Sequence, residues 1–77
     1  MAKAYLRANL VAGKEKSARD ALRKISGIKS ADFVTGSHDL VAEIEASSFE
    51  EIATQTLSEI RKVPGVSETD TDFVFGW

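Results

Sequence analysis

The chain contains an internal repeat, and this repeat limits the folds that its 77 residues can adopt. The segment RKISGI at residues 23–28 recurs as RKVPGV at residues 61–66, and DFV at residues 32–34 recurs as DFV at residues 72–74. A solenoid needs about three or more copies of its repeat, so two copies indicate a molecule built from two similar halves. We expect each half to be a helix that leads into a strand.

Hydrophobic periodicity predicts the elements of the first half. Residues 3–11 alternate in the two-residue period of a strand. From Lys14 the apolar residues fall at helical spacing instead, and Gly27 is a typical C-terminal stop for such a helix. A second strand, roughly Ile28 to Thr35, is expected to enter a turn at residues 36–39.

The second half is predicted by the same signals. A third strand, Leu40 to Ala46, leaves the turn, so the second and third strands are expected to form an antiparallel hairpin. Ser48 is expected to cap a second helix, with Glu51 reaching back to it three residues on. The apolar stripe of this helix is predicted to be Phe49, Ile52, Ala53, Leu57 and Ile60. A Pro-Gly pair at residues 64–65 ends the helix, and residues 66–77 form the last strand.

The predicted order is βαββαβ, which is the order of a ferredoxin-like α+β sandwich. Such a fold has one four-stranded antiparallel sheet with both helices on one face. We expect the bare face to be partly apolar, with Tyr5, Val11 and Val41 among its residues. The sequence does not decide on which face of the sheet three strand aromatics lie: Phe33, Phe73 and Phe75. A second copy of the chain would cover an apolar face, and a twofold dimer is the commonest symmetric assembly.

Size and composition favour oligomerisation and disfavour several partners. A domain this small buries only about 60% of its unfolded surface and often relies on disulfides, a metal or an oligomer interface. The chain has no Cys, which excludes disulfides. Because 10 basic residues stand against 12 acidic ones, binding to nucleic acid is disfavoured. No stretch resembles a signal peptide or reaches membrane-spanning length, so we expect a cytoplasmic protein without a membrane partner.

Two segments of the chain resemble a known protein family. The segment KISGIKSADFVTGSHDLVAEIEASSFEEI, followed later by IRKVPGV, is similar to the effector-binding domain of the leucine-responsive/asparagine (Lrp/AsnC) family of bacterial and archaeal transcription regulators. The most specific element is a Thr-Gly-x-x-Asp-hydrophobic pattern, matched by Thr35, Gly36, Asp39 and Leu40. The resemblance covers nearly the whole chain, from Ala4 to about residue 75.

The resemblance implies a mode of assembly and a class of ligand. Full-length members carry a helix-turn-helix module ahead of this domain, whereas Met1 stands only a few residues before the first expected strand. The chain is therefore expected to be a stand-alone effector-binding domain without a DNA reader. The family implies dimers that pair sheet against sheet into an αβ barrel, often assembled into tetramers, octamers or rings, with small amino acids bound between dimers. A full-length regulator of the same family is a further expected partner.

The turn between the second and third strands is the candidate ligand site. On composition alone it can be purely structural, because Gly36 supplies a backbone conformation that other residues resist, and Ser37 or Asp39 can bond nearby amides. With the resemblance, Gly36, Ser37 and Asp39 are expected to contact the backbone groups of an amino acid. Amides beside Gly36 could receive its carboxylate, and Asp39 could accept from its ammonium group. Thr35 and His38 are expected to support binding or to set selectivity.

The sequence favours binding over catalysis. His38 and Asp39 leave the turn toward opposite faces, so they are badly placed to form a dyad, and one His without Cys does not make a metal site. No cofactor is expected. An RNA-recognition module needs aromatics on its third strand, and LVAEIE at residues 40–45 has none. The remaining alternatives are an ACT-like amino-acid sensor and a small αβ-barrel monooxygenase or isomerase, which would rely on Asn9 and Tyr5 inside the cleft between sheet and helices.

Overall fold

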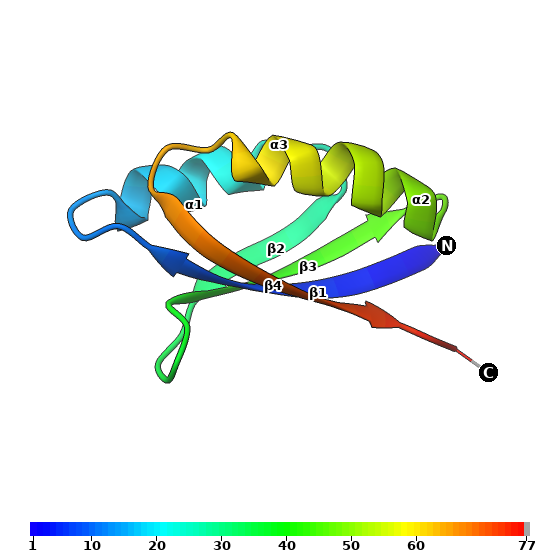
Figure 1. Cartoon of the computed structure of the whole chain (residues 1–77), viewed down its shortest axis with the longest axis horizontal. Coiled ribbons are helices and arrows are strands. Elements are labelled where there is room, and N and C mark those ends of the chain that lie inside the picture. The colour runs from blue at the N-terminus through cyan, green and yellow to red at the C-terminus, as the bar shows by residue number, and fades with distance from the viewer. Residues whose placement is uncertain (77) are drawn as a thin grey trace.

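Four antiparallel strands form one sheet, and the helices cover one of its faces (Figure 1). The computed structural model describes residues 1–76. In chain order the elements are β1 (Ala2–Leu10), α1 (Glu15–Arg23), β2 (Ile28–Phe33), β3 (Leu40–Ala46), α2 (Phe49–Glu51), η1 (Ile52–Thr56), α3 (Leu57–Arg61) and β4 (Val66–Val74). The strand order is β2-β3-β1-β4, and α2, η1 and α3 follow one another as a single second helix. The predicted βαββαβ ferredoxin-like fold is therefore confirmed.

The two copies of the sequence repeat occupy equivalent places in this fold. Gly27 follows α1 and Gly65 follows α3, and both have a φ of 98°. Each is followed directly by a strand, β2 in the first half and β4 in the second. Residue 77, which was predicted to end the last strand, lies outside the described residues, and β4 ends at Val74. The repeat thus predicted the helix-to-strand junctions correctly.

The core lies between the sheet and the helices. Successive strand residues point to opposite faces, so alternate residues of the central strands β1 and β3 turn toward the helices. The buried side chains of these strands are Ala2, Ala4, Leu6, Ala8, Leu40, Ala42, Ile44 and Ala46. The buried apolar side chains of the helices are Ala18, Leu22, Ile52, Leu57 and Ile60. Leu10, the last residue of β1, is partly buried against this core.

The second helix contains a π-helical turn, η1, that changes which residues it buries. The amide of Leu57 donates to the carbonyl of Ile52, five residues earlier. A π turn joins residues five apart, whereas an α turn joins residues four apart, so it holds one extra residue. Ile52 and Leu57, at its two ends, are both buried, and Ala53 is exposed to solvent. The prediction that Ala53 belongs to the apolar stripe is therefore wrong. Thr56 is buried instead, with 4% of its surface exposed.

The start of the second helix is capped largely as predicted. The Ser48 hydroxyl accepts a hydrogen bond from the Glu51 amide at 3.1 Å. The Glu51 carboxylate does not reach back to Ser48, because it accepts from the hydroxyl of Ser47. Phe49, the first residue of the helix, is 40% exposed, and its ring lies edge-on to Phe73 with centroids 5.5 Å apart. Of the apolar stripe predicted for this helix, only Ile52, Leu57 and Ile60 are thus buried.

The bare face of the sheet is partly apolar, as expected, but most of its residues are charged or polar. We call it the open face; by strand register its ionisable residues are Lys3, Arg7, Asp32, Glu43, Glu45, Glu68, Asp70 and Asp72. Six carboxylates against two basic groups leave this face with a net charge of −4. Tyr5 and Val41 lie on it as predicted. Val11 does not belong to the face, because it lies past the end of β1 and donates its N–H to the Gly65 carbonyl.

The strand aromatics lie on the helix side of the sheet. Phe33 is paired with buried Leu40 and Phe73 with buried Ala4, and paired residues share a face. The ring of Phe75 lies 5.7 Å from that of Phe49 at the start of α2. None of these three rings therefore adds apolar area to the open face.

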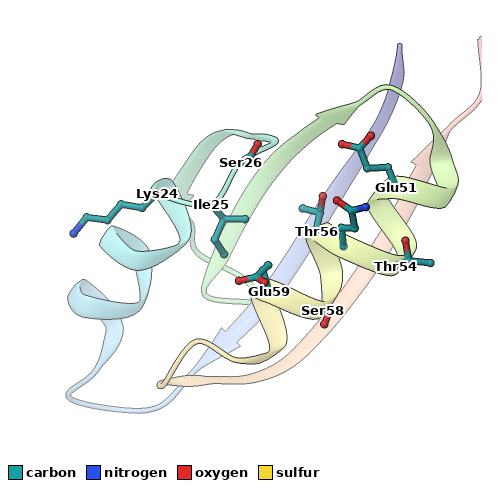
Figure 2. Close-up of a pocket in the computed structure, with 9 residues that line it drawn as sticks. Lys24, Ile25, Ser26, Glu51, Thr54, Thr56, Ser58 and Glu59 are labelled. Carbon is teal, nitrogen blue, oxygen red and sulfur yellow. The ribbon is translucent and has the colours of Figure 1, made fainter.

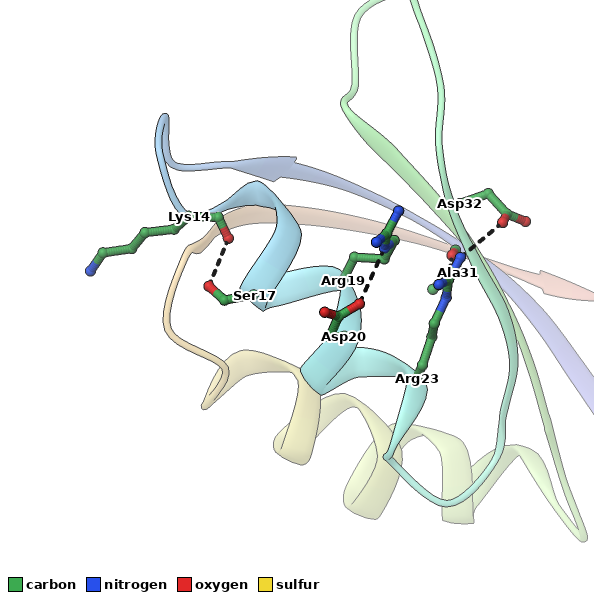
Figure 3. A network of polar contacts seen from close by, with 7 residues as sticks. All are labelled: Lys14, Ser17, Arg19, Asp20, Arg23, Ala31 and Asp32. Atoms are coloured by element: carbon green, nitrogen blue, oxygen red, sulfur yellow. Dashed lines mark hydrogen bonds and ion pairs between the residues drawn. The ribbon is translucent and has the colours of Figure 1, made fainter.

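Two arginines of α1 contact the edge strand β2, and Figure 3 shows the contacts of Arg23. Arg23 donates from Nε to the Ala31 carbonyl at 3.0 Å and pairs with Asp32 at 3.3 Å. Arg19 lies over the ring of Phe33, 4.6 Å from its centroid. Occupying a carbonyl of an edge strand limits pairing of that edge with another chain. These basic residues thus have a structural role within the domain.

Candidate functional site

The β2–β3 turn projects from the sheet on the side away from the helices (Figure 1). It brings together all five residues predicted as a ligand site: Thr35, Gly36, Ser37, His38 and Asp39. Four of them are exposed, and only His38 is partly buried. The turn therefore offers polar groups to solvent beside the open face.

Gly36 gives the turn a backbone conformation that other residues rarely adopt. Its φ is 123°, in the region that L side chains avoid. A Cβ added there would meet no atom within 4 Å, so the requirement for glycine is conformational rather than steric. The same lack of neighbours leaves the backbone around Gly36 open to approach by a ligand.

Asp39 fastens the turn to the central strand β1. Its carboxylate Oδ2 accepts from the Leu10 amide at 2.8 Å, and its own amide donates to the Ala8 carbonyl at 2.9 Å. The Asp39 carbonyl accepts from the Val34 amide at 3.0 Å, which closes the turn. The carboxylate therefore takes the place of a strand carbonyl where the β1–β3 ladder ends. This is the structural role that the turn composition predicted.

His38 contacts a residue that the sequence did not identify. Its Nε2 lies 2.9 Å from Oδ2 of Asp70 on β4, and its Nδ1 lies 3.2 Å from the Ser37 hydroxyl. His38 pairs with Asp70, 32 residues along the chain, rather than with Asp39. Its side chain is 17% exposed. The turn is thus tied both to β1, through Asp39, and to the open face, through His38.

The Ser37 hydroxyl, the His38 imidazole and the Asp70 carboxylate lie in a row, in the order of a serine-hydrolase triad. The Asp70 side chain is 61% exposed, so water screens its charge. Triad catalysis depends on fixed dipoles in a site from which water is excluded. Ser37 and His38 are also neighbours in a turn whose hydroxyl faces solvent. The contacts of this row fix the imidazole between the turn and β4.

Ion pairs link the strands of the open face. Lys3 pairs with Glu43 at 3.4 Å, and Arg7 pairs with Asp72 at 3.1 Å. A hydrogen-bonding interaction with Tyr5, followed by the charge of Glu43, raises the pKa of the Lys3 ammonium above its ordinary value. The two bases of the central strand β1 are thus each bound to an acid on a neighbouring strand.

The residues required by the enzyme alternative lie on the wrong side of the sheet. Tyr5 and Asn9 alternate with buried Leu6 and Ala8, so their side chains belong to the open face. They do not line the space between sheet and helices. Within residues 1–76, no group of three or more His, Cys, Asp or Glu side chains is arranged to hold a metal ion. The helices in this part of the chain are too short and too polar to span a membrane.

Fold and turn together define a small ferredoxin-like α+β domain with a polar hairpin turn beside an open sheet face. The chain belongs to the Lrp/AsnC ligand binding domain family, whose sequence model matches residues 3–76. This match spans both halves of the repeat and the whole of the turn.

Solved structures share this fold over the full chain. FFRP-DM1 is 27% identical with a TM-score of 0.89, and the match covers 97% of this chain and 100% of that one. The hypothetical protein PHS023 from Pyrococcus horikoshii is 26% identical with a TM-score of 0.89, covering 100% and 93% of the two chains. The transcriptional regulator NMB0573 from Neisseria meningitidis, solved in complex with L-Met, is 22% identical with a TM-score of 0.68, covering 97% of this chain and 50% of that one. A comparison with curated protein sequences finds no significant match.

Proposed function

We propose that residues 1–77 act as a single effector-binding and oligomerisation domain that has neither catalytic activity nor DNA binding of its own. It would regulate transcription or amino-acid metabolism by assembling with itself or with a full-length Lrp/AsnC regulator. The observation that carries the proposal is the geometry of the turn, where open backbone around Gly36 stands beside the fixed carboxylate of Asp39. Membership of a ligand-binding family supports it.

The effector in this proposal is a small amino acid held at the turn. Amides beside Gly36 and Ser37 would receive its carboxylate, because consecutive backbone N–H groups form anion-binding concavities. Asp39 would accept from its ammonium group, since a carboxylate has about four acceptor positions and the Leu10 amide uses only one. Thr35 and His38 would support binding and set selectivity. The Neisseria meningitidis regulator, a member of the same fold, was solved with L-Met.

The assembly in this proposal is a dimer that stacks the open faces. The centre of the strand order β2-β3-β1-β4 falls between β3 and β1. A twofold axis along the strands at this centre would therefore place β1 of one copy over β3 of the other. Lys3 and Arg7 would then face Glu43 and Glu45 of the second copy, which offsets part of the repulsion between two faces that each carry a net negative charge. Larger assemblies, such as tetramers, octamers or rings, would form from these dimers.

The effector can change assembly only through a difference in its affinity for two assembly states. The contact between His38 and Asp70 offers a route, because His38 belongs to the turn and Asp70 to the face that the second copy would cover. A ligand that moves the turn would thereby alter a charge of the dimer interface. The output would be a change of oligomer or of partner.

The test is thermal unfolding in the presence of each common amino acid at millimolar concentration. A ligand at ten times its dissociation constant stabilises the folded state by about 1.4 kcal/mol, which is roughly a 6–11 °C rise in Tm for a domain of this size. Asp39→Asn keeps an oxygen for the Leu10 amide but removes the charge that would bind ammonium, so it should abolish the shift. Glu50→Gln, which removes an exposed acid outside both the turn and the open face, is the matched control. Flat curves across the panel, or a shift that survives in Asp39→Asn, would refute the proposal.

A further inference from the structure

A cavity lies on the helix side of the molecule, away from the turn. It is a groove of about 560 Å³ between the segment that follows α1 and one side of the second helix (Figure 2). Two carboxylates, Glu51 and Glu59, lie two helical turns apart along the helix wall, about 12 Å at 1.5 Å per residue. Hydroxyl and amide groups line the space between them: Ser26, Gln55, Thr56 and Ser58.

Thr56 marks the floor of this groove with an unused polar group. The π turn η1 places its side chain inward, where 4% of its surface is exposed. Within residues 1–76 its hydroxyl has no hydrogen-bond partner, although the residue lines the groove. Gly27, the residue after Ser26, packs beside this hydroxyl, since a Cβ on Gly27 would stand 3.4 Å from the oxygen. Among the described residues no side-chain polar atom is both fully shielded and unpaired, so this hydroxyl is open to the groove, where water or a ligand can bond it.

The electrostatics of the groove favour a cation. Besides the two carboxylates, the C-terminal end of α1 at Arg23 leads into the wall formed by residues 24–26, and a helix C-terminus carries partial negative charge. The one base in the lining, Lys24, extends its ammonium group away from the groove (Figure 2). Ile25 supplies an apolar surface facing the helix (Figure 2).

We propose that this groove binds a linear organic polyamine. Its terminal ammonium groups would pair with Glu51 and Glu59, and the Thr56 hydroxyl would accept from an inner amine. Its methylene chain would lie against Ile25. This site is separate from the turn and does not depend on the effector proposed for it.

The experiment is a titration of the isotope-labelled protein with spermidine, followed by backbone amide chemical shifts at physiological salt. The expected shifts are at Ser26, Gly27, Gln55 and Thr56. Glu59→Gln should weaken binding about two- to fivefold, the usual effect of losing one solvent-exposed ion pair. Glu50→Gln, an acid of the same helix outside the groove, is the matched control and should leave binding unchanged.

Two further measurements separate a built site from general attraction to acids. Thr56→Val removes the hydroxyl but keeps the shape, so it should weaken spermidine binding without lowering the stability of the unliganded protein. n-Butylamine, which carries one ammonium group, should bind more weakly than spermidine. The proposal is overturned if no shifts occur, if they concentrate on the acids of β3 and β4, if Glu59→Gln and Glu50→Gln behave alike, or if Thr56→Val leaves binding intact.

Discussion

Asp39 carries both the proposed charge for a ligand and the link between the turn and β1, and two substitutions can separate these roles. Asp39→Ala removes the bond from the carboxylate to the Leu10 amide, 2.8 Å long. A hydrogen bond to a charged group contributes about 1.5–3 kcal/mol, and exposure of this turn to solvent lowers that to about 1–2 kcal/mol. For a domain of this size, we therefore expect Tm to fall by about 4–16 °C.

Asp39→Asn should be less destabilising, because the amide oxygen can still accept from Leu10. The loss of charge assistance alone should cost about half of that bond, about 0.5–1 kcal/mol. The assay is thermal unfolding followed by circular dichroism at one fixed protein concentration, since Tm depends on concentration in an oligomer. Thr35→Ala, in the same turn, is the control for a change that breaks no bond to β1. If Asp39→Ala and Thr35→Ala destabilise equally, the anchoring role assigned to Asp39 is incorrect.

Three other predictions follow from the turn and the open face. Gly36→Ala should destabilise the fold by about 1–2 kcal/mol in urea unfolding, because φ is 123° there; no change would mean that the turn relaxes freely. Raising the salt concentration should tighten the dimer, because two faces of net charge −4 repel each other and salt screens that repulsion. Sedimentation velocity measures the dimer fraction, which would instead fall with salt if attraction between Lys3 and Glu43 of different copies dominated. Because the pKa of Lys3 is raised on folding, its stabilising effect is present below the ordinary lysine pKa and lost as pH rises through the folded value. Lys3→Met should therefore lower the urea midpoint at pH 8, and this difference should disappear in strongly alkaline buffer.

The sequence predicted the order of elements because its signals for them are local. Alternation marks β1 and β3, and the bounds of β3, Leu40–Ala46, were predicted without error. The repeat predicted that both halves join a helix to a strand through a glycine. The π turn could not be predicted in this way, because Ile52 and Leu57 also fit a regular helical stripe. Only the hydrogen bond from the Leu57 amide to the Ile52 carbonyl distinguishes a π turn from a regular α-helix here. As a result, Thr56 rather than Ala53 lies in the interior.

The charge of the open face depends on strand pairing rather than on local pattern. In ETDTD at residues 68–72, acidic residues alternate with threonines, so the acids share one face if the segment forms a strand. Which face they occupy follows from the register, in which Asp70 is paired with Arg7 and Asp72 with Tyr5. That register joins residues more than sixty positions apart, so the expectation of a partly apolar face could not be tested on the sequence.

The same long-range register explains why the candidate site is larger than the turn that the sequence identified. Asp70 meets His38 because the turn that precedes β3 passes over β1, the strand that lies between β3 and β4. The turn and the sheet face are therefore not independent surfaces. If the open face is the dimer interface, covering it changes the surroundings of Asp70, and with them the energy of the His38 contact that holds the turn. Reciprocity then requires that whatever the turn binds must also favour or oppose the dimer by the same coupling free energy.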